Sequence, residues 1–120
     1  MKIVQNVNFK LKEMVNSETA TTPINLIKGE NILVTGILIG IKEEVDNETG
    51  EIKSLKVGVI KKDDGQLISS ISPTVINSME TIINAYTECD QISEIEKGID
   101  VAIKTGKSSK NRDFIFLELI

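Results

Sequence analysis

Histidine and tryptophan are absent from this chain of 120 residues, and cysteine and tyrosine each occur once. Without histidine, the chain lacks the side chain best suited to move protons near neutral pH and the commonest metal ligand. The single cysteine, Cys89, cannot form an internal disulfide or by itself make a zinc site, which suits a reducing compartment. We therefore expect a protein that is not an enzyme and that holds no metal or other cofactor.

Long apolar runs are also missing. No stretch approaches the roughly 18 apolar residues of a membrane span, and the N-terminus lacks the apolar run of a secretory signal. The hydrophobic share of 40 % still permits one packed core, so residues 1–120 are expected to form a single domain. These features predict a soluble, intracellular protein that does not contact membranes.

Apolar residues alternate along most of the chain, which predicts a mainly β protein. A weak strand is expected within residues 2–12, a long one within 29–45, and further strands at 52–62 and 66–72. Residues 15–24 are polar and predict a flexible loop. One helix should begin at Ser72 and Pro73 and end near Cys89 or Asp90, because apolar residues then recur at helical spacing. Residues 91–98 read as a polar connection to a final two-stranded hairpin.

This order of elements is that of an OB-like five-stranded barrel with one helix between strands 3 and 4, here with an extra N-terminal strand. The alternative is an open α+β sheet with one helix packed on it. Gly36 and Gly40 lie four apart on one face of the long strand. Such glycines mark a bulge, a bend or a close backbone approach, so they fit a strand that curls around a barrel, or else tight packing against the helix.

Of the helix residues, Tyr86 is expected in the core and Cys89 at least half-buried.

Positive charge gathers in the last hairpin, although the net charge of the chain is 14 − 18 = −4. Four cations surround the turn: Lys104, Lys107, Lys110 and Arg112. The segment contains Gly106-Lys107-Ser108 but is no P-loop, because position 101 is valine rather than glycine and a strand follows rather than a helix. In an OB-fold this loop flanks the nucleic-acid groove, and a local cluster of cations attracts phosphates.

Aromatic residues follow the cations. Phe114 and Phe116 share one face of the last strand and point outward if Ile115 and Leu117 fill the barrel, which would suit base stacking. The competing interpretation is that these rings pack under the N-terminal strand or against another subunit. Weaker candidates for contacting DNA are Lys42, Lys56 and Lys62.

Three segments resemble the small single-stranded DNA-binding proteins of protein-primed Bacillus phages. They are "NLIKGENILVTG", "DDGQLISSISPTVINSMETI" and "GKSSKNRDFIFLELI", so the likeness runs from about Asn25 to the C-terminus. The resemblance implies an OB-like fold, no enzymatic activity, a role coating displaced strands during phage DNA replication, and cooperative or oligomeric binding in some members. Members tend to place tyrosines on the binding strands, whereas this chain has Ile68 after Leu67 and no aromatic residue from Ile41 to Val45.

Two functional hypotheses follow. The first is a non-enzymatic protein that binds single-stranded DNA in the cytoplasm of an infected bacterial host. The second is a protein-interaction module on the same fold that engages a phage replication protein or inhibits a host-defence factor. The net negative charge of the chain and its few aromatic residues favour this second hypothesis. An unpaired N-terminal strand would also invite self-association, so a homo-oligomer is a further expectation.

Overall fold

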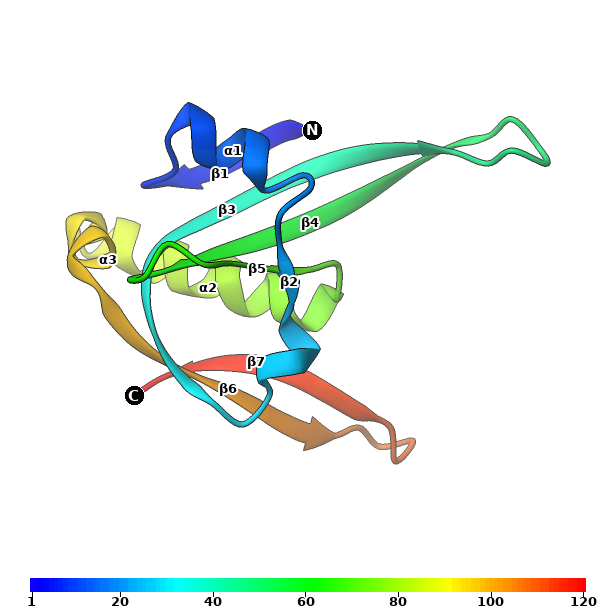
Figure 1. The fold of residues 1–120 in the computed structure, drawn as a ribbon. Coiled ribbons are helices and arrows are strands. Elements are labelled where there is room, and N and C mark those ends of the chain that lie inside the picture. Colours follow the sequence, from blue (N-terminus) through cyan, green and yellow to red (C-terminus); the bar gives the residue numbers. More distant parts are fainter.

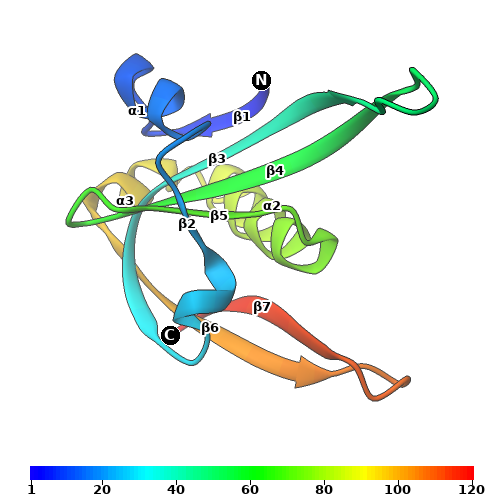
Figure 2. The same cartoon turned by 45° about the vertical axis from the view of Figure 1, so that its right-hand side comes forward.

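The protein is built around one strongly curled β-sheet with helices packed against it, as the computed structural model of residues 1–120 shows (Figures 1 and 2). Strands take up 45 % of the residues and helices 27 %, so the prediction of a mainly β protein is confirmed. The elements follow one another as β1 (Lys2–Val7), α1 (Leu11–Asn16), β2 (Thr22–Pro23), a 3-10 helix η1 (Ile24–Ile27), β3 (Asn31–Val45), β4 (Ile52–Lys62), β5 (Leu67–Ser70), α2 (Pro73–Glu88), α3 (Ile92–Lys97), β6 (Ile99–Lys107) and β7 (Asp113–Leu119).

The sheet curls but does not close. Its strand order is β2-β5-β4-β3-β6-β7, and β1 pairs with residues 37–41 in the middle of β3. A closed five-stranded barrel would need β5 to pair with β7, and that pairing is missing. The free edge of β5 is instead taken by β2, because Thr22 and Pro23 pair with Ile68 and Ser69. The sheet is therefore a half-barrel that stays open between β5 and β7, so the predicted OB-like barrel is confirmed only as far as a curled half-barrel.

The glycines of β3 give room to the N-terminal segment rather than to the helix. A Cβ at Gly36 would come within 2.9 Å of the Val7 carbonyl oxygen, and one at Gly40 within 2.6 Å of the Met1 side chain. The register with β4 also shifts between Val34 and Gly36, which marks a β-bulge. The bulge and the close backbone approach predicted for these glycines are both present. The alternative, tight packing of Gly36 and Gly40 against the helix, is wrong, because their neighbours belong to the N-terminal segment and β4.

Helix α2 covers the concave face of the sheet and supplies much of the core. It begins after Ser72 with Pro73 at its first position, as predicted. Its buried residues are Val75, Ile76, Met79, Ile82 and Ile83. They join inward residues of the sheet in one cluster of 19 buried side chains, against which Tyr86 packs while half-buried. Burial of this apolar surface is the main force that holds the helix to the sheet.

Several local expectations are wrong. The first strand ends at Val7, and Leu11 begins α1 as an exposed residue. Parts of the expected loop 15–24 lie in α1, β2 and the start of η1, although its flexibility remains a prediction. Residues 92–97 form α3, because Ile95 is fully buried in the core while the helix packs on β3 and α2. Cys89 is exposed at the end of α2.

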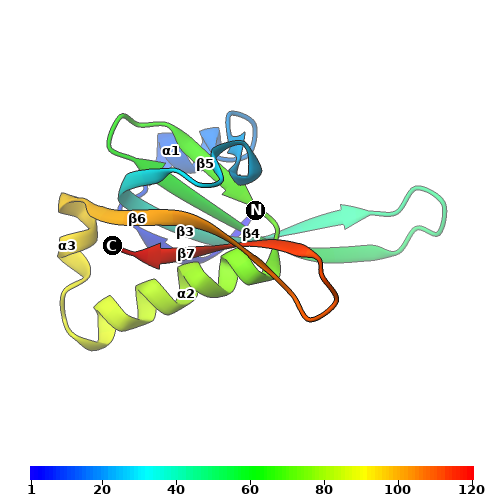
Figure 3. The same cartoon turned by 90° about the horizontal axis from the view of Figure 1, so that it is seen from below.

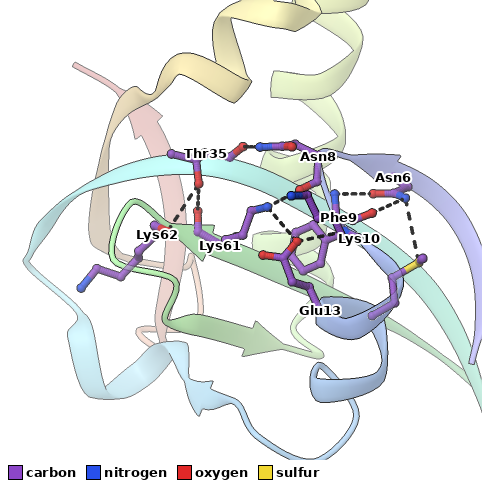
Figure 4. A network of polar contacts seen from close by, with 9 residues as sticks. Asn6, Asn8, Phe9, Lys10, Glu13, Thr35, Lys61 and Lys62 are labelled. Carbon is purple, nitrogen blue, oxygen red and sulfur yellow. Dashed lines mark hydrogen bonds and ion pairs between the residues drawn. The ribbon is translucent and has the colours of Figure 1, made fainter.

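A buried lysine fixes the N-terminal segment to β4 (Figure 4). The Lys61 ammonium lies 3.0 Å from a carboxylate oxygen of Glu13, donates to the Asn8 carbonyl and sits 5.3 Å from the centre of the Phe9 ring. Burial alone would raise the pKa of Glu13, but the Lys10 backbone N–H and the Lys61 ammonium together lower that pKa below its usual value. The ion pair therefore holds Glu13 ionised and satisfies the buried charge of Lys61.

Two hairpins extend from the same side of the half-barrel (Figure 3). The first, the β3–β4 arm, comprises residues 41–56 and turns between Val45 and Ile52. The second, the β6–β7 arm, comprises residues 104–116 and turns between Lys107 and Asp113. No helix of the protein is long enough and apolar enough to span a membrane.

Candidate nucleic-acid interface

The two arms carry opposite charge. The β6–β7 arm has four cations and one acid, Asp113. The β3–β4 arm has three lysines and five acids, which are Glu43, Glu44, Asp46, Glu48 and Glu51. Since both arms project in the same direction (Figure 1), a polyanion is drawn to the β6–β7 arm and repelled by the tip of the other. This contrast was not predicted from the sequence.

The turn of the β6–β7 arm is held by its own hydrogen bonds. Ser108 N–H donates to the Arg112 carbonyl over 2.9 Å, and Arg112 N–H donates to the Ser108 hydroxyl over 3.2 Å. Asn111 adopts a left-handed conformation with φ of 59°, which asparagine tolerates better than most residues. Lys107, Lys110 and Arg112 are exposed around this turn, where they can reach phosphates.

The pairing of β6 with β7 sorts the arm into two faces. Lys104 lies opposite Phe116, and Gly106 lies opposite Phe114, so these four residues share the outer face. Lys107 lies opposite Asp113 on the other, concave face. The cations of the arm are therefore divided between its two faces instead of forming one strip.

Phe114 and Phe116 form a half-buried pair on the outer face. Their ring centres are 5.8 Å apart and their planes are inclined by 38°. Neither ring belongs to a core cluster, whereas Leu117 is buried in the main core and Ile115 packs against it. The N-terminal strand pairs with β3 instead of covering these rings. This arrangement leaves both rings partly accessible beside Lys104 and Gly106.

Three of the candidate lysines are engaged in surface ion pairs. Lys104 lies 3.0 Å from Glu118, Lys56 lies 3.0 Å from Glu80 of α2, and Lys62 lies 3.7 Å from Asp64. Exposed pairs of this kind are worth about 0–1 kcal/mol, so Lys104 and Lys56, each with half of its side chain exposed, can exchange a carboxylate for a phosphate.

The remaining candidates are not all brought together. Lys62 lies at the end of β4 opposite to the arm, next to the turn that leads into β5. Lys42 is exposed on the convex face of the β3–β4 arm, where it lines a shallow hollow with Met1 and Glu18. Lys56 lies on the concave face, beside α2. Only the six residues of the β6–β7 arm therefore form one local group.

A pocket of about 780 Å³ occupies the opening between β5 and β7. Its walls come from β5 and the start of α2, from the segment that contains β2 and η1, and from the base of the β6–β7 arm. Phe114 contributes to its lining, and Lys28, an exposed cation that was not a candidate, contributes as well. The sequence signal for Lys28 was weak, because it is only a lysine that precedes a glycine, and the structure alone shows that Gly29 has a positive φ of 85°.

The candidate interface therefore consists of the cations and the two partly accessible aromatic rings of the β6–β7 arm, together with the pocket at the base of this arm. No group of three or more histidine, cysteine, aspartate or glutamate side chains is placed to hold a metal ion. The arrangement can neutralise phosphates and stack bases, which are the two contacts that single-stranded nucleic acid requires.

Comparisons with known proteins agree with this chemistry. A family model described as phage single-stranded DNA-binding protein, of the Phi29 type, matches residues 10–120. Comparison with the curated proteins and with the solved structures gave no significant match. The match to the family covers nearly the whole sheet, both arms and all three helices. The chain therefore belongs to the Phi29 family of phage single-stranded DNA-binding proteins.

Proposed function

We propose that this protein coats displaced single strands during phage DNA replication, without enzymatic activity, in the cytoplasm of the infected host. Membership of a phage single-stranded DNA-binding family supports DNA as the ligand. The observation that carries the assignment of the site is the β6–β7 arm, where Lys107, Lys110 and Arg112 surround a turn beside the Phe114–Phe116 pair. In this proposal the cations hold phosphates and one or both rings stack on bases.

The strand order and the position of the helix support an OB-like relationship. Strands β3, β4 and β5 precede α2, and β6 and β7 follow it, as in that fold. The β3–β4 and β6–β7 turns then correspond to the two loops that border the binding groove of an OB-fold. Within this framework the half-barrel is an opened variant, in which β2 replaces β7 at the edge of β5.

A paired charge reversal tests the site. The double variant Lys107→Glu, Lys110→Glu is expected to bind an oligo-dT much more weakly in a fluorescence titration at low salt. The matched control is Lys12→Glu, Lys97→Glu, because it changes the net charge equally and its residues are exposed on α1 and α3, away from the arm (Figure 1). Equal affinity in the two double variants would refute the assignment of the site to this arm.

A second candidate function is a protein-interaction module. Two features of the β3–β4 arm favour it. The arm is acidic, and its apolar residues Val45 and Ile52, which pair with each other near the tip, are 62 % and 65 % exposed. A partner such as a replication protein, or a second copy of the chain, would then present a basic and partly apolar surface. Absence of any binding to single-stranded oligonucleotides at low salt and micromolar protein would favour this function over the first.

A further inference from the structure

The pocket between β5 and β7 is open because these two strands do not pair with each other, and β2 pairs with the edge of β5 instead. Residues 69–72 form one wall and residues 113–115 form the opposite one. Ile24, Val75 and Ile115 give apolar surface. Its volume of about 780 Å³ falls within the roughly 300–1,000 Å³ that is usual for small-molecule sites.

Polar groups are placed around this apolar surface. Ser70, Ser72 and Thr105 supply hydroxyls, Asp113 supplies a carboxylate, and Lys28 supplies a cation. The Ser70 hydroxyl accepts a hydrogen bond from Ser72 N–H over 3.1 Å, which leaves its own proton free to donate. An apolar space with a few convergent polar groups is what a planar heterocycle requires.

The pocket is continuous with the proposed DNA-binding arm. Asp113, Phe114 and Ile115 belong both to the pocket wall and to strand β7 of that arm. Lys107 lies opposite Asp113 on the concave face, and Lys28 lines the pocket from the segment after η1. A strand held by the arm therefore passes the pocket with cations available for its phosphates.

We propose that this pocket takes one nucleobase of the bound strand, and that it favours bases that carry an exocyclic amino group. The inference rests on the proposed function. Turning a base out of a strand that is already unpaired costs little compared with extruding it from a duplex. The apolar walls replace the stacking that the base loses, which would compensate for the lack of any tyrosine on the strands of this chain.

Asp113 gives the preference its chemical basis. It is the only acid in the β6–β7 arm, and it forms none of the six ion pairs of the chain. A carboxylate accepts hydrogen bonds, so it fits the amino groups of cytosine, adenine and guanine. At the same position thymine presents a carbonyl oxygen, which a carboxylate repels. The Asp113 carboxylate weakens phosphate binding in general, but it strengthens the binding of a base that donates a hydrogen bond to it.

Competition between two pyrimidine homopolymers tests this preference without a change in base size. Wild-type protein is expected to bind oligo-dC about two- to tenfold more tightly than oligo-dT, the range that one net hydrogen bond supplies. Asp113→Asn should bring this ratio close to one, because an amide can both donate and accept. Glu118→Gln is the matched control, since it neutralises an acid on the outer face of the same strand and should leave the ratio unchanged.

Two further measurements locate the base. Ser70→Leu and Thr105→Leu each add bulk to a different wall, and either folded variant should lose the dC over dT preference. In the wild type, oligo-dC should shift the methyl resonances of Val75 and Ile115. Equal binding of the two oligonucleotides, or methyl resonances that do not move while tip residues do, would overturn the pocket and leave the proposed function intact. If neither oligonucleotide binds, both proposals fail.

Discussion

The ring of Phe114 lies directly over Gly106, its partner across the β6–β7 ladder. A Cβ at position 106 would come within 2.7 Å of the ring's Cζ atom. Glycine at this position therefore leaves room for the ring to lie against β6 and next to Phe116, whose ring centre is 5.8 Å away. The position of the main proposed stacking platform thus depends on the absence of one side chain.

Gly106→Ala should displace the Phe114 ring and weaken the binding of single-stranded oligonucleotides. Stacking is worth about 1–3 kcal/mol for each base, so Phe114→Leu sets the upper limit of the loss. If the glycine acts through the ring, adding Gly106→Ala to Phe114→Leu should cost little more, which a double-mutant cycle measures. Full additivity of the two losses would show that Gly106 acts independently of the ring.

The salt dependence of binding should report the phosphates held by the turn. For single strands the slope of log K against log salt is about −0.7 for each phosphate that is neutralised. Lys110→Ala should therefore make the slope less steep by roughly 0.7, whereas Lys62→Ala, at the far end of β4, should not change it. A change with Lys62 equal to that with Lys110 would place the path of the strand elsewhere on the molecule.

Removing negative charge from the β3–β4 arm should strengthen DNA binding. Glu48 and Glu51 are exposed in its turn, and both arms extend from the same side of the molecule (Figure 3). The double variant Glu48→Gln, Glu51→Gln should raise affinity at low ionic strength, and the gain should vanish near 1 M salt, where the screening length is about 3 Å. Glu88→Gln, Glu96→Gln on α2 and α3 is the matched control, and an equal gain there would indicate a general effect of net charge.

Loss of the Glu13 carboxylate should destabilise the fold. Glu13→Gln leaves the Lys61 ammonium, only 7 % exposed as a residue, without its counter-charge. We expect a decrease of about 1–3 kcal/mol in the free energy of unfolding at pH 7, measured with urea. An unchanged free energy would show that the Asn8 carbonyl and the Phe9 ring suffice to hold the buried ammonium.

The same ion pair should make stability depend on pH in acid. The pKa of Glu13 is lowered in the folded protein, so its contribution is complete above the unfolded value near 4.5 and is lost as the pH falls through the lower folded value. Wild type and Glu13→Gln should therefore converge in stability at acidic pH and diverge above about pH 4.5. A difference that stays constant from pH 3 to pH 7 would contradict this origin.

Local chemistry determined much of this protein from the sequence. The start of α2 at Ser72 and Pro73 and the basic turn of the last hairpin follow from residues that are neighbours in the chain. The three segments that resemble phage single-stranded DNA-binding proteins also indicated the family that the comparison found. Helix starts and turns can be predicted from the sequence because capping, turn geometry and apolar periodicity depend on only a few neighbouring residues.

Only the tertiary structure decided how distant segments meet. Two residues of β2 cover the edge of β5, and this small contact keeps the half-barrel open and creates the pocket. Helix α3 exists because Ile95 is buried where the helix packs on α2 and on β3, and β3 is distant in sequence. Likewise, nothing local separates Lys62 from the cations of the β6–β7 arm or sets an acidic arm beside a basic one. Pairing across long sequence distances depends on the packing of the whole chain, so single residues near each contact carry no signal of it.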